Sequence, residues 1–325
     1  MLSMQDGKVN RNGQSRPLVL FPGSLGDFLC FLPALEEIAN STVSGMVEIV
    51  ARGELLAMIQ RLPFVSRALS LDRGIFARLF SQPGEKGEEA SLLSFSVPEI
   101  FSWFGHIHPE VRANLDAIAP GRVQSFAFFT AQEDYHASAY YLRCLGVTEL
   151  RGPSLLLGEE ERQWLDLYWR LHDWQPSSRM LIVHPGSGGR KKRWVSEGFA
   201  QVCRWWRQRK GKVLILLGPA EEESEHWRQV GGEVESQLSI LQVAALLSRA
   251  DLYLGNDSGV SHLAGAVGAR GIVLFGPTDP RQWRPLGGAL SVIHSGQYRA
   301  ALPHVSGISL AEIPYEEVLM ALTRL

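Results

Sequence analysis

The chain has 325 residues, of which 45% are hydrophobic and 20% charged, and its formal net charge is −2. This length favours two domains of about 150 residues each, and the composition is that of a water-soluble globular protein. The small net charge argues against a nucleic-acid partner, and the polar N-terminus and the lack of an apolar run of about 18 residues predict a cytoplasmic protein.

The first half of the chain alternates predicted strands and helices. After a tail at 1–16 that we expect to be disordered, an apolar strand at 17–21 ends at Pro22-Gly23. Apolar residues then recur at helical spacing from Asp27 to Ala39. The other expected elements are strands at 47–50, 92–97 and 125–129, a mobile polar loop at 81–90 and a helix at 134–145. This order predicts a first α/β domain, which we place at 17–158.

The second half begins with a helix at 159–174 that we expect to link the domains. Its Trp164, Leu167, Leu171 and Trp174 recur at a spacing that predicts one apolar, partly aromatic face. Four strand-to-turn units follow at 180–188, 212–222, 250–259 and 271–279, with helices at 196–209, 240–248 and 258–267. Nearly uninterrupted apolar runs are typical of strands buried on both faces of a parallel sheet. The segment 159–311 is therefore predicted to be a doubly wound α/β domain.

Unusual polar residues stand where these predicted strands end, which is where ligands bind on such sheets. Gly186, Gly188 and Gly189 precede the four cations at 190–193, and together they predict either a phosphate cradle or a solvated basic loop. In GNDSGVSHLAGA (255–266), an Asp or Ser is placed to cap a helix whose open N–H groups attract anions.

Each of these polar residues has a structural interpretation as well. Asp257 and Ser258 would serve only as helix caps, and His262 would be a core histidine. Glu221 is suited to ribose hydroxyls or to the first turn of a helix. Asp27, after the glycine turn PGSLGD, is either an N-terminal cap or a carboxylate that takes a proton from an acceptor hydroxyl. The coincidence of several such strand ends favours a ligand site.

Four stretches together resemble one family, the bacterial ADP-heptose:lipopolysaccharide heptosyltransferases of glycosyltransferase family 9. They are PGSLGDFLCFLPAL (22–35), HPGSGGRKKRW (184–194), LLGPAEEE (216–223) and LYLGNDSGVSHLAGAVGARGIVLFGPTDPRQWRP (252–285). The resemblance implies a GT-B architecture, in which two Rossmann-like domains face each other across a cleft. The first would bind the acceptor and the second the nucleotide sugar, and a C-terminal helix at 312–325 would pack back on the first domain.

The resemblance also implies an inverting, metal-independent transfer of a sugar, namely heptose from ADP-heptose, to a lipopolysaccharide core or related envelope glycan, without a cofactor. Carried over by position, Asp27 looks like the general base. The implied donor-binding residues are Ser187, Gly188, Lys192, Glu221, Asp257, Ser258, Gly259 and His262. The expected partners are a nucleotide sugar and a lipid-linked or oligosaccharide acceptor, with peripheral contact at the cytoplasmic face of the inner membrane.

Two other functions remain open, a nucleotide-sugar epimerase on a similar scaffold and a nucleotide-sugar-binding protein without catalysis. A nicotinamide dehydrogenase is disfavoured because no G-x-G-x-x-G follows a predicted strand. The pair His106 and His108 lacks a third ligand nearby, and the three cysteines are widely spaced, so no metal site is expected. Arg52, Arg73 and Arg78 would meet an acidic acceptor or be ordinary surface residues.

Overall fold

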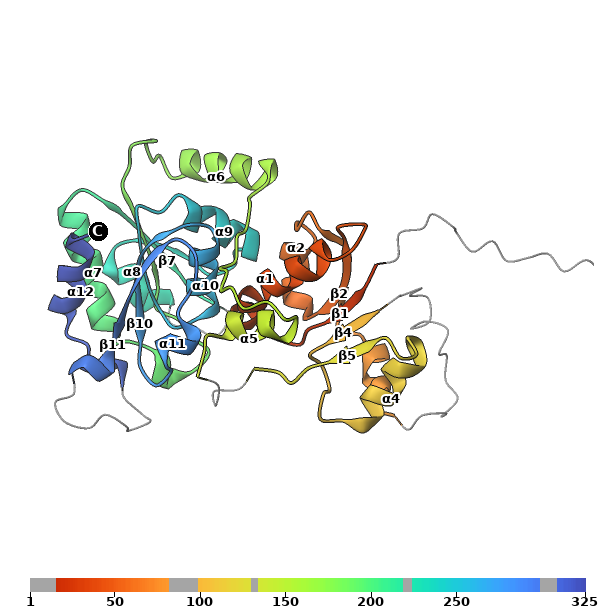
Figure 1. The fold of residues 1–325 in the computed structure, drawn as a ribbon. Coiled ribbons are helices and arrows are strands. Elements are labelled where there is room, and N and C mark those ends of the chain that lie inside the picture. The colour runs from red at the N-terminus through yellow and green to blue at the C-terminus, as the bar shows by residue number, and fades with distance from the viewer. Residues whose placement is uncertain (1–15, 82–98, 130–133, 219–223, 299–308) are drawn as a thin grey trace, which may run out of the picture.

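The computed structural model describes residues 16–81, 99–129, 134–218, 224–298 and 309–325, and these form two α/β domains (Figure 1). The first domain holds a sheet of strand order β3-β2-β1-β4-β5, and the second a sheet of order β11-β10-β9-β6-β7-β8. All neighbouring strands are parallel. Two parallel sheets joined by helical crossovers confirm the doubly wound, Rossmann-like organisation expected from the sequence.

In the first domain, the sheet consists of short strands with helices on both sides. The strands are β1 (Leu18–Leu20), β2 (Val47–Ala51), β3 (Val65–Ser70), β4 (Ile100–Ser102) and β5 (Val123–Ser125). The helices are α1 (Leu25–Asn40), α2 (Leu56–Ile59), α4 (Pro109–Ile118) and α5 (Ala137–Cys144), with 3₁₀ turns η1 (Gly53–Leu55) and η2 (Gly74–Phe80). The apolar face of α1 packs on the sheet through aromatic rings, and Phe31 stacks on Phe21 of the β1 end with ring centroids 4.1 Å apart.

The first sheet differs from the sequence-based expectation after β5. The strand predicted at 125–129 is wrong except for Ser125, which closes β5. The residues after it leave the sheet because their rings join the aromatic cluster on α1 and α5, where Phe128 lies 5.6 Å from Phe21. The strand predicted at 92–97 and nearly all of the predicted tail and polar loop lie outside the described residues.

In the second domain, each strand predicted from an apolar run is present. The strands are β6 (Met180–His184), β7 (Lys212–Leu216), β8 (Glu233–Glu235), β9 (Leu252–Asn256), β10 (Arg270–Phe275) and β11 (Ala289–His294). The helices are α6 (Glu159–Leu171), α7 (Ser196–Gln208), α8 (Ser224–Val230), α9 (Ile240–Ser248), α10 (Gly259–Ala266), α11 (Pro280–Trp283) and α12 (Tyr315–Thr323). The central strands β6 and β9 are buried along their whole length, as continuous apolar runs predict.

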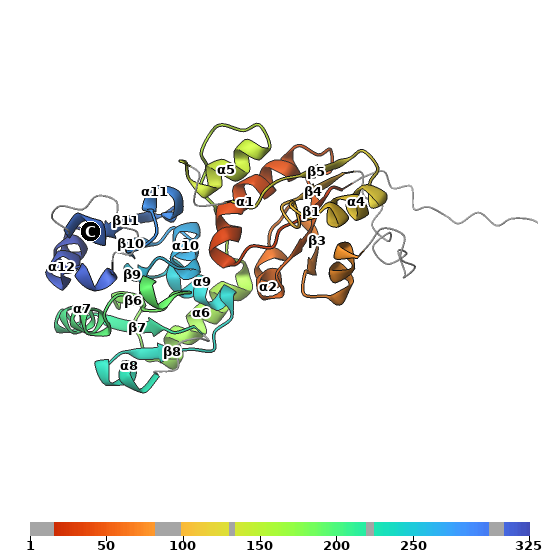
Figure 2. The same ribbon diagram turned by 90° about the horizontal axis from the view of Figure 1, so that it is seen from below.

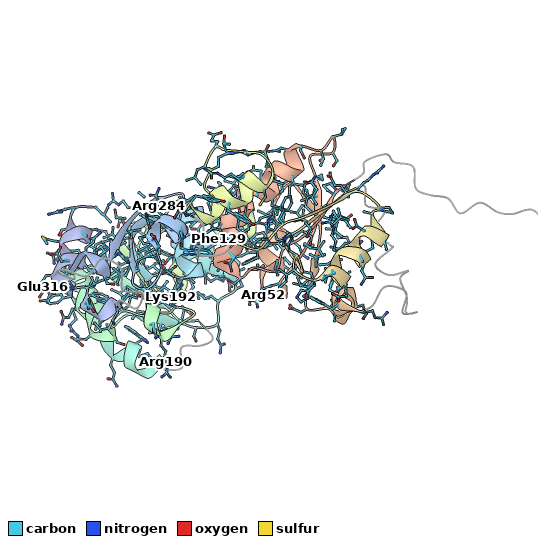
Figure 3. All side chains as sticks on the ribbon, turned by 60° about the horizontal axis from the view of Figure 1, so that its bottom comes forward. Arg52, Phe129, Arg190, Lys192, Arg284 and Glu316 are labelled. Carbon is cyan, nitrogen blue, oxygen red and sulfur yellow. The ribbon has the colours of Figure 1, made fainter. Side chains whose placement is uncertain are left out.

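The expectation that the C-terminal helix packs on the first domain is wrong. Helix α12 lies on the second domain, at the end remote from the first (Figures 1 and 2), and Figure 3 shows its Glu316 there. Its buried Val318 and Leu322 share a core cluster with Phe199 of α7. An apolar helix face does not by itself specify which hydrophobic surface it covers, and here that surface belongs to α7.

The apolar face predicted for the linking helix is confirmed for Trp174, which is buried, and for Trp164, which is partly buried against the core, but it is wrong for the two leucines. Leu167 and Leu171 are 47% and 74% exposed, whereas Leu165, Tyr168 and Trp169 are buried. Aromatic and aliphatic residues occur around the whole helix, so spacing alone does not select the buried side. On the buried side, the Tyr168 hydroxyl donates to Glu235 at 2.8 Å, which anchors α6 to β8.

The two domains meet where α1 and α10 come together at their N-terminal ends, near the middle of both ribbon views (Figures 1 and 2). The approach is close because both helices begin with glycine-containing turns. A Cβ atom on Gly259 would lie 3.0 Å from Leu25 Cβ, and one on Gly26 would lie 3.3 Å from His262 Cδ2. This contact brings the strand ends of the second sheet next to the first turn of α1.

Candidate active site

A cavity of about 650 Å³ lies where the first turn of α1 faces the strand ends of the second domain. This volume suits a small-molecule ligand, because ligand pockets are typically about 300–1,000 Å³. Of the nine residues implicated by the sequence, those that line the cavity are Asp27, Ser187, Gly188, Lys192, Asp257, Ser258, Gly259 and His262. The ninth, Glu221, lies outside the described residues. The fold thus gathers side chains that are more than 200 residues apart in sequence.

Asp27 both caps a helix and faces the cavity. Its Oδ2 accepts hydrogen bonds from the backbone N–H of Ser24 at 3.0 Å and from the Ser24 hydroxyl at 2.7 Å. Its Oδ1 receives no hydrogen bond from the described residues. The capping interpretation and the general-base interpretation are therefore compatible, because one oxygen is held by the helix start and the other is available to a ligand.

Asp257 is the centre of a polar cluster at the end of β9. It is 6% exposed, and its Oδ2 accepts from Lys192 Nζ at 2.8 Å and from the Thr278 hydroxyl. A buried carboxylate is stable only with such partners. An ammonium group has three hydrogens, so the lysine that pairs with Asp257 retains donors for a ligand. Sequence reasoning did not single out Thr278, although the GPTD turn that carries it was part of the family resemblance.

The glycine-rich loop after β6 is fixed to the same strand end. The Ser187 hydroxyl donates to the backbone carbonyl of Asp257 at 2.8 Å, so it joins the two turns. Asn256, fully buried, donates from Nδ2 to the Pro185 carbonyl at 2.7 Å and accepts from the Trp194 N–H. A Cβ on Gly188 would meet nothing within 4 Å, so this loop leaves open space on its cavity side.

Trp194 anchors the basic loop to the core of the second domain. Its ring is buried against Phe199, with centroids 5.1 Å apart, and its indole N–H donates to the carbonyl of Ile313 at 3.0 Å. The basic residues before it form a 3₁₀ turn, η3 (Arg190–Lys192). Figure 3 shows Lys192 toward the region between the domains and Arg190 further from it. One cation of the basic run therefore reaches the polar cluster of Asp257.

The start of α10 has the capping geometry expected from sequence. Ser258 is the N-cap, and its hydroxyl accepts from the N–H of Ser261 at 3.3 Å. Gly259 follows it and lies against Leu25 of the other domain. A larger residue at this position would collide with Leu25, so the glycine permits the close approach of the two domains.

His262 is one turn into α10, 4% exposed, and it lines the cavity. Its Nδ1 lies 3.6 Å from Sγ of Cys30 in α1. Burial lowers the pKa of His262 to about 4, and the Asp257 carboxylate acts in the opposite direction. The imidazole is therefore neutral at neutral pH.

Two further lining residues were not identified from the sequence. His184 ends β6 and donates from Nδ1 to the Leu216 carbonyl at 2.9 Å. Its position at a strand end, before Pro-Gly, is the signal that would have found it. Glu54 reaches the cavity from η1 of the first domain, next to Arg52, whose guanidinium lies 3.6 Å from its carboxylate. Figure 3 shows Arg52 on the first-domain side, opposite Lys192.

The His106–His108 pair points to separate partners. The Nδ1 atom of His106 lies 3.2 Å from the Ser125 hydroxyl, and the ring of His108 packs on Phe80. Across the described ranges, no group of three or more His, Cys, Asp or Glu side chains is arranged to hold a metal ion. No helix in those ranges is long and apolar enough to cross a membrane.

Comparison with known proteins matches residues 160–306 to the family described as "Glycosyltransferase family 9 (heptosyltransferase)". Lipopolysaccharide heptosyltransferase 3 of Escherichia coli K12 is 24% identical over 197 residues, 57% of each chain. The matched part of this chain covers only 33% of the length of one curated heptosyltransferase and 57% of the length of another.

Solved structures resemble the chain over nearly its whole length. A family 9 glycosyltransferase of Veillonella parvula has a TM-score of 0.78 at 19% identity, covering 95% of this chain and 96% of its own. The ADP-heptose lipopolysaccharide heptosyltransferase II of E. coli has a TM-score of 0.74 at 16% identity, covering 95% and 98%. Both share the arrangement of two parallel-sheet domains. The matched segment, which makes up most of the second domain, is therefore similar to glycosyltransferase family 9, and the likeness to these structures over nearly the whole chain shows that the chain has the GT-B fold.

Proposed function

We propose that the chain transfers heptose from ADP-heptose to a lipopolysaccharide core or a related envelope glycan, with inversion at the anomeric carbon and without a metal ion or other cofactor. The observation that carries this proposal is the position of a carboxylate, Asp27, and a cation, Lys192, in one cavity but on different domains. The donor is inferred from the relatives, one of which is described as an ADP-heptose lipopolysaccharide heptosyltransferase.

In the proposed reaction, an acceptor hydroxyl oxygen attacks the anomeric carbon of the donor sugar from the side opposite the phosphate. Oδ1 of Asp27 takes the hydroxyl proton, the new glycosidic bond forms, and the bond from the anomeric carbon to the phosphate oxygen breaks. The electron pair of that bond leaves with the nucleoside diphosphate. Attack from the opposite face inverts the configuration at the anomeric carbon.

The second domain would bind the leaving group. Negative charge accumulates on the bridging phosphate oxygen, and preoriented donors stabilise it most where water is excluded. Lys192, held by Asp257, would offset that charge, and the open N–H groups of α10 after Ser258 would bind phosphate oxygens. Ser187 and Gly188 would shape the same phosphate site, and Glu221 would contact the nucleoside. A lysine in this position supports a reaction without a metal ion.

The acceptor would enter from the first domain, where Glu54 lines the cavity and pairs with Arg52. A lipid-linked acceptor would bring the chain to the cytoplasmic face of the inner membrane, so we propose a peripheral contact there. The cavity is bounded by both domains and is open toward solvent between them. This opening leaves room for a large acceptor.

The test is to incubate the purified chain with ADP-heptose and lipopolysaccharide truncated before its core heptoses. Mass spectrometry should show an acceptor heavier by one heptosyl unit, and NMR of the product should show the anomeric configuration opposite to that of the donor. The rate should be unchanged by EDTA. Conversion of the donor without any acceptor would support the epimerase alternative, and tight binding without turnover would support a non-catalytic binding protein.

A further inference from the structure

Two buried side chains from different domains meet behind the cavity. Sγ of Cys30 lies 3.6 Å from Nδ1 of His262, and the two residues are 2% and 4% exposed. Cys30 is one turn after Asp27 on α1, whereas His262 lies on α10 and lines the cavity. The contact therefore joins the helix that carries the proposed base to the helix that would bind the donor.

Both groups are uncharged at neutral pH. Burial, with a further contribution from the Asp27 carboxylate, raises the pKa of the Cys30 thiol, so the thiol keeps its hydrogen. Burial lowers the pKa of His262, which is therefore a neutral imidazole with one N–H group and one acceptor nitrogen. The charged or titratable groups that act on His262 are Asp257, His136, Asp27 and Lys192.

We propose that the Cys30 S–H group donates to Nδ1 of His262 and thereby fixes the imidazole hydrogen on Nε2, where it serves as a hydrogen-bond donor to a ligand in the cavity. An S–H group is a weak donor and sulfur a weak acceptor, whereas an unprotonated imidazole nitrogen is a good acceptor. The pairing of S–H with Nδ1 is therefore better than the reverse arrangement. Cys30 is in this sense a positioning residue, since it acts on a ligand only through His262.

His136, the other histidine that acts on the pKa of His262, has no N–H group left for a ligand. His136 already uses both ring nitrogens, because Nδ1 accepts from the N–H of Ser138 at 3.1 Å and Nε2 donates to the Arg284 carbonyl at 2.8 Å. The Nε2–H group of His262 suits an oxygen acceptor, such as a diphosphate oxygen. The inference depends on the proposed function for the identity of that ligand, but the tautomer itself is a property of the free protein.

The decisive measurement is the tautomer of His262, read from the ¹⁵N shifts of its two ring nitrogens in protein labelled at histidine. The signals are assigned by their loss in His262→Gln. Hydrogen on Nε2 is expected in the wild type and in Cys30→Ser, which keeps a donor. A mixture of tautomers is expected in Cys30→Ala, and in Cys30→Val, which fills the space without a donor. Hydrogen on Nδ1 in the wild type, or an unchanged tautomer in both non-donor variants, overturns the proposal.

The consequence for binding is tested with ADP by calorimetry at pH 7. One neutral hydrogen bond corresponds to about 2- to 10-fold in affinity, so Cys30→Ala and Cys30→Val should bind ADP weaker by about that factor and Cys30→Ser nearly as well as the wild type. Equal affinities in all variants overturn the role of Nε2. Failure of the wild type to bind ADP contradicts the proposed donor, while the ¹⁵N spectra still decide the tautomer.

Discussion

Substitution of Asp27 by Asn separates its two roles, because they depend on different properties of the side chain. The Asn amide oxygen still accepts from the N–H and hydroxyl of Ser24, so the cap is retained. The loss is that of a negative charge at a helix N-terminus, about 0.3–1 kcal/mol of stability. An amide cannot take a proton from the acceptor, so the transfer rate should fall by about two to four orders of magnitude.

The matched control is Ser24→Ala, which removes the N-cap hydroxyl and leaves the carboxylate. Loss of the hydrogen bond from this hydroxyl to Asp27 Oδ2 costs about 0.5–1.5 kcal/mol, so this variant should lose about as much stability as Asp27→Asn while losing far less activity. Stability is read from urea unfolding, ADP binding from calorimetry and transfer from initial rates with ADP-heptose. Unchanged turnover in Asp27→Asn, or equal losses of rate in the two variants, would refute the assignment of Asp27 as the base.

Three other predictions concern the second domain. The Lys192→Met variant should bind ADP more weakly, and its transfer rate should be lower by about 10²–10³-fold. An unchanged transfer rate in kinetic assays would show that Lys192 does not stabilise the leaving group. Asn256→Leu leaves the Pro185 carbonyl and the backbone N–H of Trp194 without a partner, so the free energy of unfolding in urea should fall by about 2–4 kcal/mol. A change below about 1 kcal/mol would contradict the role of Asn256 in holding these loops. Because the pKa of His262 falls from its ordinary value to about 4 on folding, the unfolded chain binds the proton first as pH drops. Stability should be fully present above pH 6.5 and decline toward pH 4, by up to about 3 kcal/mol, and this decline should be weaker in His262→Gln.

Sequence pattern predicted the second domain better than the first. A strand buried on both faces needs apolar residues throughout, so β6, β9 and β10 stand out as runs. The strand β3 reads VSRALS and has no fully buried residue, and β4 has only three residues. Neither strand has a hydrophobic pattern that distinguishes it from a loop. Both strands form because they pair with strands that are distant in sequence.

The sequence by itself also determined which residue types stand at the strand ends, since glycines, a capping serine and an acid at a turn carry their own local chemistry. Only the tertiary structure decided what they contact. Thr278 as a second partner of Asp257, Cys30 as the neighbour of His262 and α12 on the second domain all depend on segments far apart in the chain. Local sequence fixes backbone geometry over a few residues, whereas such contacts arise from the packing of whole helices and sheets, which no local pattern encodes.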